Sequence, residues 1–248
     1  MQESPVAPIL RGLEELQAEY MKAITHLKET RSFLTDIDIR ITPFLKCFHV
    51  IQSTFISMDL FDKYVGEGSW WAAYFPEVAR EQFVIAAHEF DRFHRLAFLH
   101  LFHFAIDSSL RTISKTISHS AIKSGTAKSK DLNLFVLHEL KLEKYLSVLC
   151  IIRLLRNVGH NNGTYTGNTV TLQFRGKPYV FEKDNEPIFY GWLLFIEIAQ
   201  EVKNLLVDIA NSDKLGQSAI ADRNAISLNN SIGSFLVFRN QNEPANDS

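Results

Sequence analysis

Eleven residues in the second half of the chain combine side chains that can hold a phosphate and move a proton. They read RLLRNVGHNNG, from Arg153 to Gly163. At 3.6 residues per turn, Arg153 and His160 fall on one face of a helix, and Arg156 or Asn157 lies between them on that face. Arginine presents a planar fork of donors to phosphate oxygens, and histidine exchanges protons near neutral pH. The segment therefore predicts that two cations and a histidine converge at the C-terminal end of a helix.

The residues before this segment make Arg153 unusual. From Tyr145 to Leu155 the sequence is YLSVLCIIRLL, which is apolar on nearly every side and indicates burial. A buried guanidinium without a partner is very costly, so we expect Arg153 to be largely buried against a carboxylate or a polar helix face. Alternatively, Arg153 extends its charged end to solvent, and Arg156 and His160 only stabilise the negative end of the helix dipole.

A second apolar stretch, Leu96 to Ile106, also carries polar residues. With their continuation they recur at spacings of three or four and share one helix face: His100, His103, Asp107, Arg111 and Ser114. The simpler expectation is that this face meets solvent. The functional expectation is that Asp107 or a histidine faces the end of the first helix, which would lower the cost of burying an arginine there.

Metal binding by this face is a weaker alternative. Imidazole and carboxylate groups suit zinc or iron, but a di-iron bundle needs Glu-x-x-His twice. The sequence holds one similar pattern, from Asp91 to His94, with Asp in place of Glu. It contains no Gly-rich phosphate loop and no Cys-x-x-Cys pair. We therefore expect neither a metal nor another cofactor.

The composition excludes several classes of protein. The 248 residues are 46% hydrophobic and 22% charged with a net charge of −2, which is typical of a globular chain and not of a highly basic nucleic-acid coat. The cysteines, Cys47 and Cys150, have apolar neighbours and indicate a reducing compartment. We find neither a secretory signal nor an apolar run near the length of about 20 residues that spans a membrane. The expected location is the cytoplasm, without a membrane partner.

Few glycines and prolines interrupt the chain, which predicts an all-α bundle of long helices with one small β-hairpin before the last core helix. The expected helices are Ile9–Leu34, a helix capped by Asp36 that runs to Tyr64, Pro76–Ser118, Leu132–Val158 with Asp131 as its cap, and Pro187–Asn211. The expected strands are Thr169–Phe174 and Tyr179–Glu182, joined by a turn over Arg175–Pro178.

Three further segments have distinctive compositions. The aromatic segment Ser69–Phe75 is expected to be a loop that fills the core, and Ala121–Lys130 a mobile basic loop. Phe235–Arg239 has strand composition and could extend the hairpin. The resulting organisation is a flexible lead (1–8), a single helical domain (9–211) that contains the hairpin at about 169–182, and a peripheral tail (212–248).

The segment RLLRNVGHNNG resembles the HEPN superfamily (higher eukaryotes and prokaryotes nucleotide-binding domain). Those proteins are all-α and carry an arginine, usually followed by a polar residue, with four to six residues between it and a histidine. Here Arg156 is followed by the polar Asn157, but only three residues separate it from His160. Arg153 has six residues between it and His160 but is followed by Leu154, so each arginine matches one part of the pattern and both are candidates for the family's role. The order of an Asn-Asn-Gly turn, a hairpin and a closing helix with Trp192 is similar to bacterial relatives of this type. The resemblance in architecture extends from about residue 92 to residue 211.

The resemblance implies a metal-independent endoribonuclease. In such an enzyme His160 would transfer the proton, and Arg156 or Arg153 would stabilise the phosphate. The residues expected to support the site or bind substrate are Asn157, Asn161, Asn162, Asp107, His103, His100 and Arg111. Relatives pair two motifs across a dimer, so the expected partners are RNA and a second copy, with an interface around 156–162. A role in stress or phage defence, with a protein partner such as an antitoxin, would be consistent with this family.

A second hypothesis comes from a different class. Many members of the superfamily are thought to be inactive, so the chain would instead be a helical module that binds RNA, a nucleotide or a protein partner. The sequence contains nothing that excludes this alternative.

Overall fold

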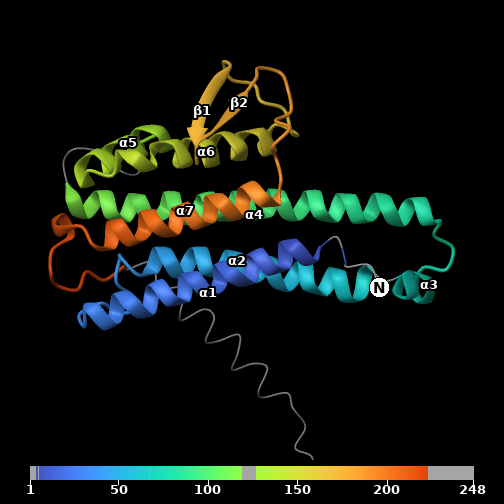
Figure 1. The fold of residues 1–248 in the computed structure, drawn as a ribbon, viewed down its shortest axis with the longest axis horizontal. Coiled ribbons are helices and arrows are strands. Elements are labelled where there is room, and N and C mark those ends of the chain that lie inside the picture. The colour runs from blue at the N-terminus through green and yellow to red at the C-terminus, as the bar shows by residue number, and fades with distance from the viewer. Residues whose placement is uncertain (1–3, 5, 67, 119–126, 223–248) are drawn as a thin grey trace, which may run out of the picture.

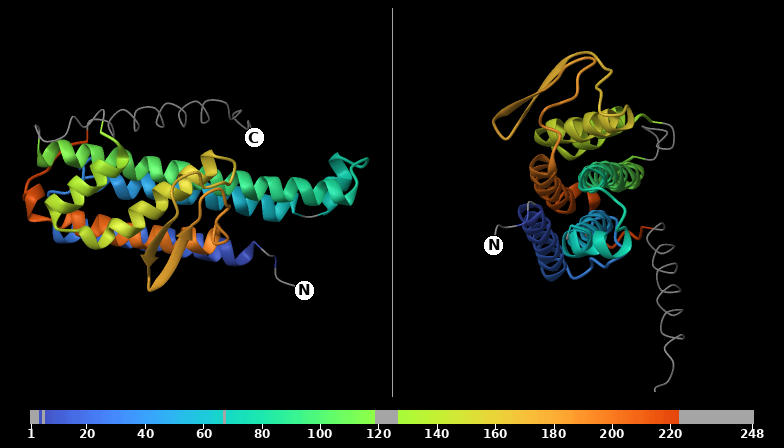
Figure 2. Two further views of the ribbon diagram at one scale, coloured as in Figure 1. Left: turned by 90° about the horizontal axis from the view of Figure 1, so that it is seen from above. Right: turned by 90° about the vertical axis from the view of Figure 1, so that its right-hand side faces the viewer.

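The computed structural model of the chain describes residues 4, 6–66, 68–118 and 127–222. Long helices lie in three layers of two (Figure 1). These are α1 (Ala7–Thr30) with α2 (Thr42–Leu60), α4 (Arg80–Ile117) with α7 (Trp192–Ala210), and α5 (Ser129–Leu140) with α6 (Leu146–His160). The end-on view in Figure 2 shows the same layers, with the hairpin beyond α6. The expected all-α bundle with one small hairpin is confirmed.

Helix α4 is the longest element and extends through the middle layer (Figure 1). Its 38 residues correspond to about 57 Å at 1.5 Å per residue. Its buried side chains all lie in its second half, between Phe98 and Ser114, where it packs against α2, α5 and α6. The polar face of α4 that the sequence singled out therefore lies where the layers meet.

The hairpin consists of β1 (Val170–Phe174) and β2 (Lys177–Phe181), paired antiparallel. Arg175 and Gly176 form a two-residue turn with φ of 49° and 73°. Positive φ at both positions matches the right-handed twist of the strands, so the turn is shorter than expected, and Lys177 and Pro178 belong to β2. Buried rings of Phe174, Tyr179 and Phe181 attach the hairpin to the bundle. The predicted hairpin is thus correct in place and pairing.

The loop between α1 and α2 differs from the prediction. Helix α1 ends at Thr30, and α2 begins at Thr42 with Pro43 in its first turn, where the fixed φ of proline suits a helix start. Asp36 is not a cap but pairs with Lys28. At its other end, α2 ends at Leu60 and is followed directly by a π-helical turn, η1 (Phe61–Val65).

A fully buried ion pair holds this loop. The Arg40 guanidinium binds Asp38 through Nε and Nη2, each at 2.8 Å, and neither side chain is exposed. Its remaining donors bind backbone carbonyls of Leu215, Gly216 and Ser218. Burial alone would raise the pKa of Asp38, but hydrogen bonds from Arg40 and from the Ile220 N–H hold it below its usual value.

The C-terminal part of the described chain is consequently anchored to the bundle. A short 3-10 helix, η3 (Asp213–Leu215), buries Leu215, and Ala221 forms an isolated bridge with Asp38. Residues 212–222 are therefore attached to the bundle through the buried Leu215 and Asp222, while most of the other residues in this segment lie at the surface. Residues 223–248, with the expected strand at Phe235–Arg239, lie outside the described residues, as do residues 121–126 of the expected basic loop.

Several other boundaries were predicted wrongly. Helix α4 was expected to begin at Pro76 but begins at Arg80, because residues 76 and 77 form a turn. The segment expected to fill the core is the short helix α3 (Gly68–Tyr74), and its Tyr74 is exposed. The single helix expected after Asp131 is two helices, because Lys141 adopts a left-handed φ of 59° after α5, and the 3-10 turn η2 (Glu143–Tyr145) precedes α6. Asp131 lies inside the first turn of α5. Residues from Pro187 form a turn closed by the Tyr190 N–H, so α7 begins only at residue 192.

We predict that Asp38→Ala destabilises the protein by about 3–5 kcal/mol, because the substitution leaves a buried guanidinium without its counter-charge. The exposed neighbour provides a matched control: Asp36→Ala removes a surface pair and costs at most about 1 kcal/mol. Urea unfolding at pH 7 measures both. Equal losses in the two variants would show that the buried pair has no special role.

Candidate functional site

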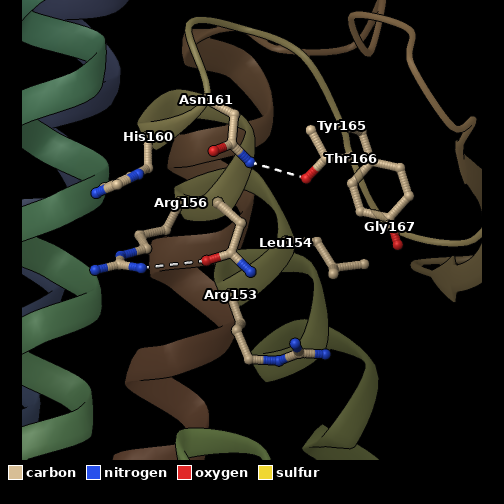
Figure 3. A pocket seen from close by; sticks show the side chains of 9 residues that line it. Arg153, Leu154, Arg156, His160, Asn161, Tyr165, Thr166 and Gly167 are labelled. Carbon is tan, nitrogen blue, oxygen red and sulfur yellow. Dashed lines mark hydrogen bonds between the residues drawn. The ribbon is translucent and has the colours of Figure 1, made fainter.

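The C-terminal end of α6 and the loop that follows it line a pocket of about 240 Å³ (Figure 3). The lining residues are Arg153, Leu154, Arg156, Asn157, His160, Asn161, Tyr165, Thr166 and Gly167. Five residues that the sequence singled out thus meet in one cavity. Two cationic side chains and an imidazole among them make it suitable for an anion such as a phosphate.

Local backbone geometry fixes the end of α6. Asn162 adopts a left-handed φ of 54° and Gly163 a φ of 91°, and the Gly163 N–H donates to the Val158 carbonyl at 2.9 Å. This is a Schellman-type helix end, which Asn and Gly accommodate readily. The Asn161 side chain donates from Nδ2 to Thr166 Oγ1 at 3.1 Å, which ties the turn to the loop across the pocket (Figure 3). The predicted helix stop is confirmed.

Arg156 and His160 extend together toward helix α4 (Figure 3). The Arg156 guanidinium donates from Nη1 to Asn157 Oδ1 at 3.2 Å. On α4, the ring of His100 lies parallel to the ring of His160, with 6.4 Å between centroids and 4° between planes. The expectation that a histidine of the polar face meets the end of α6 is therefore confirmed, and that histidine is His100.

Two histidines of α4, His100 and His103, have pKa values below the usual value. Burial lowers the pKa of His100, and the charges of Arg156 and His160 lower it further. Burial also lowers the pKa of His103. The charge of Asp107 partly offsets this decrease, whereas the charges of Arg156, His100 and Arg153 add to it. Nε2 of His100 is buried and has no hydrogen-bond partner among the described residues. A neutral, enclosed imidazole thus lies behind the exposed one.

Arg153 departs from the expectation. Its side chain is only half-buried, lines the pocket, and has no ion pair or hydrogen bond with any residue that the structure describes. Asp107, one candidate partner, instead binds Arg111 one turn further along α4, at 2.7 Å. Arg153 needs no buried carboxylate because the face of α6 that carries it opens into the pocket.

The other predicted residues divide between two places. Asn162 lines a second pocket on the other side of the last turn of α6. His103 and Asp107 lie against Ser129 and Asn133 of α5, apart from the first pocket. Arg111 continues this row through its pair with Asp107 and lines neither pocket. The structure therefore does not assemble the whole α4 stripe at the site.

Sequence reasoning missed Tyr165 and Thr166, which form the outer wall of the pocket. The Tyr165 hydroxyl donates to the Asn168 carbonyl at 2.9 Å, and a Cβ at Gly167 would lie 2.5 Å from that hydroxyl. The ring can take this position only because residue 167 has no side chain. The Thr-Tyr-Thr-Gly sequence directly after the helix stop was the available signal.

Metal and membrane patterns were also sought. Within the described ranges, no three His, Cys, Asp or Glu side chains are placed to hold a metal ion together. None of the described helices combines the length and the apolarity that crossing a membrane requires.

Neither family models, curated proteins nor solved structures include a match to this chain. The site is therefore interpreted from its own geometry and chemistry.

We predict that the protein loses stability on acidification through the histidine range. His100 and His103 have pKa values below the unfolded value of 6.5, so the unfolded chain binds more protons. Their contribution is present above about pH 6.5 and declines as the pH falls through the lowered folded values. In the double variant His100→Gln/His103→Gln, Tm measured between pH 8 and pH 5 should fall less steeply than in the wild type. His26→Gln, at an exposed position of α1, should retain the wild-type slope, and an unchanged slope in the double variant would contradict the assignment.

Proposed function

We propose that the chain is a HEPN-type endoribonuclease that cleaves RNA by transesterification from the ribose 2′-hydroxyl without a metal ion. The observation that carries this proposal is that Arg156 and His160 line one open pocket at the end of α6, where the ring of His100, whose pKa is lowered, stacks on the ring of His160. An exposed imidazole can transfer a proton, and a cation beside it can stabilise the negative charge of a phosphate.

The proposed reaction uses the side chains as follows. His160, which is exposed, accepts the proton of the 2′-hydroxyl, and the 2′-oxygen attacks the adjacent phosphorus. The bond from phosphorus to the 5′-oxygen breaks, and this oxygen takes up a proton. The products are a 2′,3′-cyclic phosphate and a 5′-hydroxyl. An arginine stabilises the additional negative charge of the pentacoordinate phosphate.

We assign the family's arginine to Arg156. Its guanidinium is oriented by Asn157 and extends in the same direction as His160 (Figure 3). Arg153 lies about one turn earlier on α6, where its unpaired guanidinium is suited to hold a neighbouring phosphate of the same RNA. The geometry thus favours Arg156, which is followed by a polar residue, over Arg153, which has the longer spacing to His160.

A homodimer completes the proposed site. The reaction moves two protons, and the second histidine near the pocket, His100, has Nε2 buried, so a second copy would supply the other exposed imidazole. Large apolar side chains exposed on α4 near His100 support an interface there, with Phe93 at 64% and Phe104 at 70% of full exposure. A two-fold contact would bring the 156–162 segments of both chains into one cleft.

We predict that the purified protein cleaves labelled RNA in the presence of EDTA and leaves 2′,3′-cyclic phosphate ends. His160→Ala should lower the rate by about 10²–10⁴-fold, because a positioned acid–base group contributes that much. Arg156→Ala should lower it more than Arg153→Ala. The control is His26→Ala, an exposed histidine on α1, which should cleave at the wild-type rate.

The alternative function has its own outcome in this experiment. Absence of cleavage on every RNA tested, together with tight binding of RNA, a nucleotide or a protein partner, would contradict the enzyme and support a binding module. Cleavage that is unchanged in His160→Ala would indicate a contaminating nuclease.

We predict that Phe104→Asp converts the homodimer to a monomer in light scattering across a concentration series and lowers RNA cleavage in parallel. A charge in the centre of an apolar interface is desolvated without a partner. Ile56→Asp changes an exposed apolar residue on α2, away from the motif, and should leave both properties intact. A monomeric wild type with full activity at micromolar concentration would contradict the shared site.

A further inference from the structure

A second pocket, of about 200 Å³, lies on the other side of the last turn of α6. It is lined by Arg92, Arg95 and Leu96 of α4, by Gly159, Asn162 and Gly163 at the end of α6, and by Glu186 and Tyr190 before α7. His160 lines the first pocket and its neighbour Gly159 lines the second. The two pockets therefore share one helix turn as a common wall.

Two contacts hold Arg95 in this pocket, and its buried Nε is left without a partner within the described part of the chain. Its Nη2 pairs with Asp91 Oδ2 at 2.9 Å, and its Nη1 donates to the Tyr190 carbonyl at 3.0 Å. Asp91 is itself fixed, because the indole N–H of Trp192 donates to its Oδ1 at 2.7 Å. Nε of Arg95 is buried and has no hydrogen-bond partner within the described part of the chain. Leaving a charged donor unsatisfied is costly, so such an atom points to a missing acceptor.

The Tyr190 hydroxyl is a second unsatisfied group. It is buried and makes no hydrogen bond with the residues described. Burial raises the pKa of Tyr190 to about 12, with Arg95 opposing and Glu186 adding to the shift, so the hydroxyl is neutral and can donate. A Cβ at Gly159 would lie 3.3 Å from this oxygen, which places the hydroxyl directly against the turn that carries His160.

Glu186 supplies the complementary acceptor. Its carboxylate lies over the Gly163 turn, where a Cβ would be 3.5 Å from Oε1. Gly163 has a φ of 91°, so a side chain is disfavoured there and the carboxylate keeps access to the pocket. The cavity thus offers two donors from Arg95 and Tyr190, one anionic acceptor from Glu186, and an apolar wall from Leu96.

We propose that this second pocket binds a guanine base of single-stranded RNA next to the scissile bond; this inference rests on the proposed function. Guanine presents two adjacent acceptors, O6 and N7, which match the donors of Arg95 and Tyr190. Next to O6 it presents the N1–H and N2–H₂ donors, which match Glu186. Adenine carries an amino group in place of O6, so its N–H donors would face the N–H and O–H donors of Arg95 and Tyr190. Single-stranded RNA is commonly read in this way, by hydrogen bonds to the edges of an unstacked base.

The common wall defines what the second pocket would do for the first. A base bound against Gly159 and Tyr190 places its own nucleotide beside His160, one residue further along α6. Cleavage is therefore directed to a phosphate adjacent to guanosine. The second pocket thus selects which phosphate is cleaved, whereas the first pocket, with Arg156 and His160, carries out the cleavage.

The test measures nucleotide binding separately from cleavage. Isothermal titration of the full chain with 5′-GMP, 5′-AMP, 5′-CMP and 5′-UMP should give the tightest binding for GMP, by about tenfold or more. Glu186→Gln and Tyr190→Phe should each weaken GMP binding about tenfold and reduce its advantage over AMP. Glu29→Gln, an identical change at an exposed site on α1, serves as the matched control.

Cleavage of RNA oligonucleotides with a single guanosine gives the second measurement, and wild-type cuts should fall beside that guanosine. Equal binding of all four nucleotides, or GMP binding unchanged in both variants, would overturn the guanine pocket. Cleavage without base preference would also overturn it and leave the nuclease standing. Guanine-selective binding that is lost in the variants, without any cleavage, would support the pocket and refute the nuclease.

Discussion

Helices α4 and α6 can touch at the functional end because residue 159 has no side chain. A Cβ at Gly159 would lie 2.5 Å from a Leu96 methyl group, 3.3 Å from the Tyr190 hydroxyl and 3.7 Å from Nε2 of His100. The parallel stacking of His100 on His160 and the common wall of the two pockets both depend on this approach. A larger residue would require the Leu96 side chain to move and would crowd the Tyr190 hydroxyl and the ring of His100.

The features that follow from local chemistry were predictable from the sequence. The apolar periodicity of long helices indicated an all-α bundle, and alternating strand residues around a short turn indicated the hairpin. The end of α6 was predictable because Asn and Gly tolerate the left-handed backbone. The grouping of Arg156, Asn157 and His160 followed from helical spacing alone, and the structure places them in one pocket.

The features that depend on distant partners were not predictable. Asp38 and Arg40 look like surface loop residues, and their burial requires carbonyl groups that lie about 175 residues later in the chain. Lys141 adopts a left-handed conformation that its residue type does not signal, so α5 and α6 appeared continuous. The exposure of Arg153 depends on the loop around Tyr165, whose position is set by tertiary contacts. Spacing along a helix defines which residues share a face but not what covers that face.

The long reach of the Arg40 contacts has a consequence for how the protein is made. Synthesis delivers the N-terminal layer first, and the guanidinium of Arg40 must wait for the carbonyls of residues 215–218, which leave the ribosome after every element of the site. The charge of Arg40 is already paired with Asp38 in the same loop, but its other buried donors have no acceptor until residues 215–218 have been translated. Completion of this layer is thus tied to a late part of the chain, and a product truncated before residue 215 retains buried guanidinium donors without their carbonyl partners.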